Sequence, residues 1–199
     1  VIARGLCNKH YQRMMKGYKI PVAERYNQEA FKTVDEKCSY FLGVLYGDGW
    51  LQEKFNRPGT KVLGLKLNDE DVVRKYGEYL NLPDKVYFHQ RKGGNPYWSL
   101  EITTKSIVEN IEQLGLSTDK SKSQKKPNIP DDMYKHFIRG LMDSDGTICK
   151  DGRADIYVTG EIVDWLYELI SQNYRVSRNV SHITETGVEI TRISVLSGR

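Results

Sequence analysis

Two aspartates occupy the same place in two copies of one short pattern. Residues 41–49 (FLGVLYGDG) and 138–146 (IRGLMDSDG) each have a glycine in third place, then an apolar run, then a small residue followed by Asp and Gly. Asp145 lies 97 residues after Asp48, which is about half of the 199-residue chain. A pattern that occurs once in each half predicts two similar units that each supply one carboxylate to a shared place.

Helices are the elements that would bring these carboxylates together. If both segments are helical, their small residues lie four apart on one stripe, a spacing that lets two helix backbones pack closely. These small residues are Gly43 and Gly47 in the first segment and Gly140 and Ser144 in the second. Each helix is expected to end near its Asp, because the next glycine, Gly49 or Gly146, tolerates the left-handed C′ conformation. Asp48 and Asp145 are then neighbours at the two C-terminal ends.

Two neighbouring carboxylates at helix C-termini are electrostatically unfavourable. They repel each other, and each also meets the negative end of its helix dipole. A divalent cation relieves both penalties, and ligation by oxygen atoms alone favours Mg²⁺ or a similar hard ion. The alternative is that Asp48 and Asp145 are ordinary turn residues, since Asp-Gly is a common turn pair. Two equivalent violations of helix electrostatics favour the metal site.

The two segments resemble the paired LAGLIDADG motifs of homing endonucleases in their single-chain form. The resemblance extends from about Ser39 to the end of the chain. It implies an α+β fold with two pseudo-symmetric αββαββ(α) halves, whose antiparallel sheets form a DNA-binding saddle. It also implies divalent-metal-dependent hydrolysis of DNA phosphodiesters with Mg²⁺ or Mn²⁺. In this interpretation Asp48 and Asp145 are the catalytic metal ligands, and the backbone carbonyls of Gly47 and Ser144 add to the ligand set.

Basic side chains near the carboxylates are the remaining catalytic candidates. The family often places a Lys or Gln on the second strand, where it supports the attacking water or stabilises phosphate charge, and Lys66 has this place in the first half. Its counterpart in the second half is Tyr157, so Lys150 is the substitute candidate. Asp143 corresponds to Tyr46 in the first copy of the motif, and this difference argues that neither is a required metal ligand.

The patterns after each motif predict the same order of elements in both halves. The first half is expected to contain hairpins of 50–56 with 61–68 and of 85–91 with 97–103, and helices at 69–80 and 105–114. The second is expected to contain helices at 131–145 and 161–173, and hairpins of 147–150 with 153–159 and of 175–183 with 188–195. The last strand alternates poorly, which predicts a β-bulge there, and no closing helix follows it. The predicted divisions are a basic N-terminal extension (1–38), the first half (39–116), a linker (117–130) and the second half (131–199).

Each half would have helices on one face of its sheet only, so the other faces would form a wide, curved, polar surface. Arg, Lys, Gln and Asn side chains read base edges in the major groove, whereas Tyr, Ser and Thr often bind phosphates. The strand parities predict the following DNA-binding residues: Gln52, Lys54, Lys66, Asn68, Tyr87, His89, Arg91, Tyr97, Ser99, Glu101, Thr103, Arg153, Asp155, Tyr157, Thr159, Arg175, Ser177, Asn179 and Ser181. For any one of them, an ordinary solvated sheet face is the alternative.

The distribution of charge also favours a nucleic-acid partner. The net charge of the chain is +4, and residues 1–39 hold eight Lys or Arg against four acids, so they account for the whole excess. A second basic cluster, consisting of Lys120, Lys122, Lys125 and Lys126, lies in the predicted linker. Such patches suit polyphosphate binding, although runs of charge are often solvated surface.

Cysteine usage and hydropathy exclude two other classes of protein. The three cysteines are far apart and odd in number, so a disulfide framework is not expected and a reducing environment is. The chain contains no long apolar run and no signal-peptide pattern, so we expect an intracellular protein (cytoplasm, nucleoid or organelle matrix) that is neither secreted nor in a membrane. The resemblance to the single-chain form implies a monomer. Cys7 and His10 have the spacing of half a zinc site, but without a second pair we expect a basic arm there and no zinc.

The predicted function is that of a site-specific endonuclease acting on double-stranded DNA with a long asymmetric target site. Such a homing endonuclease belongs to an intron, an intein or a free-standing element. The alternative on the same fold is an RNA splicing maturase or a DNA-binding regulator that does not cleave. Residues 143–147 (DSDGT) also match the loop of haloacid-dehalogenase-type phosphatases, but that loop must follow a buried strand, whereas helix signals precede it here.

Overall fold

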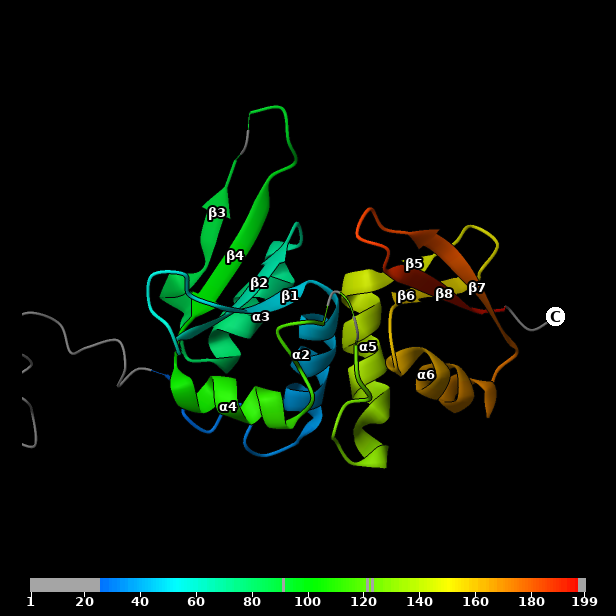
Figure 1. Cartoon of the computed structure of the whole chain (residues 1–199), viewed down its shortest axis with the longest axis horizontal. Helices are drawn as coiled ribbons and strands as arrows, with labels where there is room; N and C mark the ends of the chain where they lie inside the picture. Colours follow the sequence, from blue (N-terminus) through cyan, green and yellow to red (C-terminus); the bar gives the residue numbers. More distant parts are fainter. Residues whose placement is uncertain (1–25, 91, 121, 123, 197–199) are drawn as a thin grey trace, which may run out of the picture.

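The chain folds into two units that repeat one order of elements (Figure 1). A computed structural model describes residues 26–90, 92–120, 122 and 124–196. Each unit contains a four-stranded antiparallel sheet, with strand orders β1-β2-β4-β3 and β5-β6-β8-β7. The two identical orders confirm the predicted α+β fold and its internal repeat.

The elements of the first unit are α2 (Glu36–Gly47), β1 (Gly49–Glu53), β2 (Lys61–Leu67), α3 (Glu70–Tyr79), the 3₁₀ turn η2 (Pro83–Lys85), β3 (Tyr87–His89), β4 (Tyr97–Ile102) and α4 (Lys105–Gln113). Those of the second are the 3₁₀ turn η3 (Asp131–Met133), α5 (Tyr134–Asp145), β5 (Gly146–Ile148), β6 (Ala154–Val158), α6 (Ile162–Ser171), β7 (Val176–Ile183) and β8 (Glu189–Val195). Each predicted helix and strand is present, with ends that differ by a few residues. In the described part of the chain, no helix is long and apolar enough to cross a bilayer.

Helices α2 and α5 stand side by side between the two sheets and pack along the predicted stripe of small residues (Figure 1). A Cβ added to Gly43 would lie 2.0 Å from the carbonyl oxygen of Phe137, and one added to Gly140 would lie 1.9 Å from that of Tyr40. No side chain tolerates such a contact with backbone, so these two glycines set the separation of the helices.

The last glycine of each motif has a different role from the one predicted. Gly146 has φ −95°, and Gly49 is not among the residues with positive φ, so neither adopts the left-handed conformation. A Cβ added to Gly49 would instead lie 2.7 Å from the carbonyl oxygen of Leu45, and one added to Gly146 would lie 2.4 Å from that of Met142. Each helix leads directly into the first strand of its unit, and only glycine fits this tight exit.

Residues 26–38 of the predicted N-terminal extension pack against the first unit. Ala30 and Phe31 are each 1% exposed. The backbone N–H of Phe31 donates to the hydroxyl of Tyr79 of α3 at 3.0 Å, and Asn110 of α4 donates to the carbonyl of Ala30 at 3.1 Å. This segment is therefore part of the core of the first unit, and the other residues of the extension, 1–25, lie outside the described residues.

The N-terminus of α2 depends on a side-chain cap. The carboxylate of Asp35 accepts a hydrogen bond from the backbone N–H of Cys38 at 2.7 Å, which satisfies one of the free donors of the first turn. As a result α2 begins at Glu36, three residues before the motif-bearing half was expected to begin.

The two sheets match position by position but differ in burial at one edge. Leu51 pairs with Leu63 in the first sheet, and Ile148 pairs with Ala154 at the equivalent place in the second. Leu51 is 3% exposed, whereas Ile148 is 70% exposed. Within the described residues, the helix-facing side of β5 therefore lacks the cover that β1 has.

The predicted bulge is present, but it lies in a different strand. The register shifts between Val180 and His182, so the extra residue is Ser181 of β7 and not a residue of β8. In β8, Ile193 is buried on the helix side, while Ile190 lies half-buried on the opposite face. The uneven pattern of β8 thus reflects an apolar residue on the polar face and not a break in the strand.

Candidate metal centre and nucleic-acid interface

Asp48 and Asp145 meet at one end of the α2–α5 pair. Asp48 caps α2, with its backbone N–H donating to the carbonyl of Val44 at 3.1 Å, and Asp145 is the last residue of α5. A Cβ added to Gly47 would lie 3.1 Å from Oδ2 of Asp145 and 2.0 Å from Oγ of Ser144. The carboxylate of Asp145 therefore lies against the last turn of α2, next to Asp48.

The surroundings of both carboxylates favour their protonated forms. Burial raises the pKa of Asp145 to about 6, and the charge of Asp48 adds to this shift while that of Lys120 opposes it. Burial likewise raises the pKa of Asp48, against the opposing charges of Lys120 and Lys66. Two carboxylates that are partly desolvated and mutually repulsive form a site that gains from a bound cation.

Lys120 completes this site, and our sequence analysis did not single it out. Its ammonium group donates to the carbonyl oxygen of Tyr46 at 2.8 Å and also to the carbonyl oxygen of Gly47. Burial lowers its pKa to about 8, an effect that Asp145 and Asp48 oppose. The only signal in the sequence was the basic cluster of the linker, which does not reveal that one of its lysines turns inward.

The donor set fits a hard divalent cation. It consists of two carboxylates and the Gly47 carbonyl, which are all oxygen atoms; the Gly47 carbonyl accepts from Lys120 and has a second lone pair for an ion. The described residues contain no group of three or more His, Cys, Asp or Glu that could hold a metal. Mg²⁺ is commonly held by one or two protein carboxylates together with substrate phosphates and water. The hydroxyl of Ser144 donates to the carbonyls of Gly140 and Leu141, each at 3.1 Å, so a role for Ser144 as a ligand would fall to its own carbonyl.

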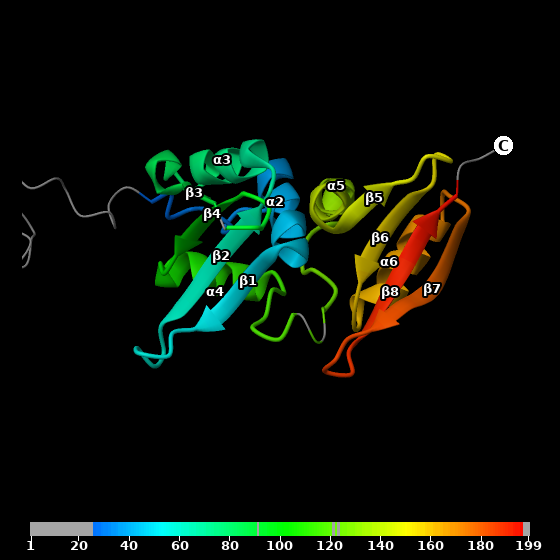
Figure 2. The ribbon, with the colours of Figure 1, turned by 90° about the horizontal axis from the view of Figure 1, so that it is seen from above.

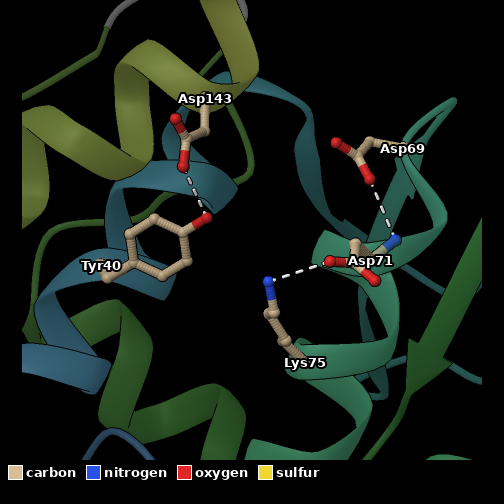
Figure 3. A network of polar contacts seen from close by, with 5 residues as sticks. All are labelled: Tyr40, Asp69, Asp71, Lys75 and Asp143. Atoms are coloured by element: carbon tan, nitrogen blue, oxygen red, sulfur yellow. Dashed lines mark hydrogen bonds and ion pairs between the residues drawn. The ribbon is translucent and has the colours of Figure 1, made fainter.

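Asp143 and Tyr46, the unequal pair of the two motifs, both turn away from the carboxylate pair. The carboxylate of Asp143 accepts a hydrogen bond from the hydroxyl of Tyr40 at 2.7 Å, and Lys75 of α3, which pairs with Asp71, lines the same pocket (Figure 3). At the equivalent cross-helix position, the buried ring of Tyr46 packs edge-on against Phe137, with 5.0 Å between centroids. Each side chain therefore makes a contact between the two helices, and the prediction that neither is a required metal ligand stays a prediction.

Of the two predicted basic residues, one lies near the carboxylates. Lys66 is exposed on β2, its Nζ lies 4.3 Å from the ring centroid of Tyr97, and its charge acts on Asp48. Tyr157 has the equivalent place on β6, as predicted from the aligned hairpins. Lys150 is exposed in the turn between β5 and β6 and is not among the charges that shift the pKa of either aspartate. Lys120, and not Lys150, is the second lysine whose charge acts on the two aspartates.

The face of the first sheet turned away from α4, here called the first open face, carries a connected group of predicted contact residues. His89 stacks on Tyr97 with 4.6 Å between centroids, and its Nε2 lies 2.8 Å from Oγ of Ser99. The other predicted residues described on or beside this face are exposed or half-buried; they are Gln52, Lys54, Lys66, Asn68, Tyr87, Glu101 and Thr103. Arg91 lies outside the described residues.

The first open face also carries a side chain that the sequence analysis missed. The indole of Trp50 lies over Gly64, where an added Cβ would be 2.2 Å from the ring. Only glycine at position 64 leaves room for this ring.

The equivalent face of the second sheet, the second open face, departs from the prediction at two residues. Asp155 is 2% exposed and pairs with Nε of Arg153 at 3.1 Å, and Thr159 is 6% exposed and donates to the carbonyl of Glu189 at 2.7 Å. Neighbouring side chains cover both, so they are not available to DNA in this structure. The other predicted residues are exposed or half-buried: Arg153, Tyr157, Arg175, Ser177, Asn179 and Ser181.

Arg192 is a further candidate on the second open face. It lies in register between Tyr157 on β6 and Asn179 on β7. Our parity assignment missed it because the apolar residues of β8 fall on both faces of the sheet.

Two packed helices that each deliver an aspartate to one end, with one four-stranded antiparallel sheet on either side, define the LAGLIDADG fold. Similar solved structures include the homing endonuclease I-WcaI bound to its DNA recognition sequence, with a TM-score of 0.53 and 13% identity over 97% of this chain and 85% of that one. They also include mesophilic variants of the homing endonuclease I-DmoI, with a TM-score of 0.51 and 16% identity over 82% of this chain and 97% of that one. At these identities the similarity establishes the fold alone.

The fold also occurs in a protein that is not named as an endonuclease. Full-length DUF199/WhiA from Thermatoga maritima has a TM-score of 0.51 and 14% identity, and the match covers 85% of this chain and 55% of that chain. No protein family and no curated protein matches the sequence.

Proposed function

We propose that this protein is a site-specific endonuclease that cleaves double-stranded DNA with the help of divalent metal ions. The observation that carries this proposal is the meeting of Asp48 and Asp145 beside Lys120, between two open sheet faces. One chain supplies both carboxylates, so a monomer is sufficient. The similar fold of I-WcaI, which is bound to its DNA recognition sequence, supports DNA as the ligand.

The arrangement of the two units suits a duplex laid across both sheets. Seen from above, the two sheets lie on either side of α2 and α5 (Figure 2). A duplex that contacts both open faces would pass over the C-terminal ends of these helices, which places its phosphates near Asp48 and Asp145. Exposed Lys, Arg, Tyr and Ser side chains on both faces can then bind the backbone and read base edges.

Each group of the site has a definable role in hydrolysis. Asp48 and Asp145 would hold Mg²⁺ or Mn²⁺, with the Gly47 carbonyl as a further donor. When bound, such an ion activates water and stabilises the charge that develops on phosphate oxygens. Lys120 fixes the last carbonyls of α2 and balances the negative charge of the pair, and Lys66 projects from β2 to stabilise the scissile phosphate.

A plasmid library with randomised inserts tests the proposal. We expect linear products with Mg²⁺, none with EDTA, and none from Asp48→Asn, because the ion would lose one of its two carboxylates. Asp143→Asn is the matched control, since Asp143 lies in the same motif but bonds Tyr40; it should still cleave. Full activity of Asp48→Asn, or intact plasmid in every arm, would contradict the proposal.

A DNA-binding protein that does not cleave, or an RNA maturase, is the second candidate. DUF199/WhiA, which has the same fold, keeps this candidate open. So does the second open face, where Tyr157 takes the place of Lys66 and Asp155 is buried. Specific binding of duplex DNA or intron RNA without cleavage in any divalent metal would favour it.

A further inference from the structure

The C-terminal end of α2 obtains its hydrogen-bond partners from a distant part of the chain. The last carbonyls of an α-helix have no donors within the helix and must find them elsewhere. In α2, the carbonyl of Tyr46 accepts from Nε2 of Gln124 at 2.8 Å as well as from Lys120 at 2.8 Å. The linker, 73 or more residues further along, therefore completes the turn that carries Asp48.

Gln124 is buried, and its hydrogen bonds reach both units. The residue is only 5% exposed. Its side-chain Oε1 accepts a hydrogen bond from the backbone N–H of Thr159 at 3.0 Å. Its backbone N–H donates to the carbonyl of Thr159 at 3.1 Å, and its carbonyl accepts from Ile162 at 2.9 Å. One residue thus joins the last turn of α2 to the end of β6 and the first turn of α6.

These contacts link the DNA-facing strand of the second unit to the carboxylate of the first. Thr159 directly follows β6, which carries Tyr157 on the second open face, and its hydroxyl bonds the start of β8. Tyr46 stands two residues before Asp48. A displacement of β6 relative to α2 would therefore move the Tyr46 carbonyl unless Gln124 releases it.

We propose that Gln124 is a positioning residue of the proposed metal site, which holds the last turn of α2 in register with the second unit so that Asp48 stays beside Asp145. This inference rests on the proposed function, because it takes the two aspartates as ion ligands. Gln124 touches neither DNA nor metal in this scheme and acts through Tyr46 and Thr159. Residues that orient metal ligands typically change metal affinity by about 10- to 100-fold when they are replaced.

The test compares the affinity of the full chain for Mn²⁺ by electron paramagnetic resonance, without DNA, beside the thermal midpoint of each variant. Gln124→Met, which removes both amide bonds, should raise the dissociation constant for Mn²⁺ by about tenfold or more. Gln124→Asn is the milder variant if Gln124→Met does not fold, because its shorter amide cannot reach Tyr46 and Thr159 at once. It should weaken binding by a smaller factor.

Asn128→Leu is the matched control. Asn128 lies in the same linker and also donates its amide to a helix-end carbonyl, that of Gln113 at 3.2 Å, but it is exposed and at the end of α4. Its replacement should leave Mn²⁺ affinity within about twofold of the wild type. If the folded Gln124 variants bind Mn²⁺ as the wild type does, Gln124 only joins the units and the inference is overturned.

The result also separates the inference from the proposed function. A wild type that binds Mn²⁺ and cuts no DNA ends the endonuclease proposal, while the comparison of affinities still decides the role of Gln124. A wild type that binds no Mn²⁺ without DNA overturns the inference, and the endonuclease proposal falls with it only if the plasmid library also stays intact.

Discussion

Replacing Asp145 by Asn should stabilise the metal-free protein while it removes the proposed cleavage of DNA. The pKa of Asp145 is raised from 3.8 to about 6, mainly by burial and then by Asp48. Between pH 3.8 and about pH 6, the carboxyl of Asp145 keeps its proton in the folded protein but has lost it in the unfolded chain. Stability therefore falls as the pH rises through this window, and the full penalty is present above pH 6.

The size of the penalty follows from the shift. A change of roughly two pKa units, at about 1.4 kcal/mol for each, corresponds to about 3 kcal/mol at pH 7.5. The Asn side chain escapes this penalty but loses the attraction of Lys120, so we expect a net gain of about 1–2 kcal/mol. For a chain of this size, that is a rise of about 2–8 °C in the thermal midpoint.

Thermal unfolding followed by circular dichroism in EDTA, at pH 7.5 and pH 4, measures this effect. The stabilisation by Asp145→Asn should be present at pH 7.5 and nearly absent at pH 4, and Mg²⁺ should stabilise the wild type but not the variant. Asp143→Asn, two residues away on the exposed side of α5, weakens the hydrogen bond from Tyr40 and should not be more stable than the wild type at pH 7.5. A variant that is less stable than the wild type at pH 7.5 would refute the electrostatic account, and so would a thermal midpoint shifted by the same amount at both pH values.

Three further outcomes are expected. Gly43→Leu should lower the free energy of unfolding by about 3 kcal/mol or more, because even a Cβ there would lie 2.0 Å from the carbonyl oxygen of Phe137; an unchanged midpoint in urea unfolding would contradict the helix packing. Lys66→Met should slow cleavage in a time course more than Tyr157→Phe does, because Lys66, unlike Tyr157, places a charge beside Asp48; equal effects would contradict this asymmetry. Deletion of residues 1–25 should weaken DNA binding and reduce the slope of log affinity against log salt by about 0.9 for each lost phosphate contact, while the cut position stays the same; an unaltered slope would show that this segment does not contact phosphates.

The repeated motif was sufficient to predict the fold and the two carboxylates. The reason is that α2 and α5 interact through local, periodic features. These are small residues four apart and an Asp-Gly at the C-terminal end of each helix. The strand parities were equally informative in the first sheet, where Leu63 and Leu65 are buried and Lys66 is exposed. In a regular helix or strand, the spacing of the apolar residues shows which face is buried.

What the sequence did not reveal depends on contacts between distant segments. Lys120 and Gln124 belong to a polar, aperiodic linker, and nothing in its composition shows that two of its side chains turn inward to the end of α2. Likewise, the burial of Asp155 depends on Arg153 and its neighbours and not on the parity of β6. Gly49 and Gly146 were correctly singled out but for the wrong reason. Glycine is required both where two backbone segments pass closely and where φ is positive, so the sequence does not distinguish the two cases.

The uneven cover of the two sheets has a consequence for motion. Ile148 of β5 is 70% exposed, whereas its counterpart Leu51 of β1 is 3% exposed. Strands with few buried apolar contacts open locally at a smaller free-energy cost, so we expect the amide protons of β5 to exchange with solvent sooner than those of β1. Asp145 immediately precedes β5, and Asp48 immediately precedes β1. We therefore expect any local opening at the carboxylate pair to begin on the side of Asp145, next to the less covered strand.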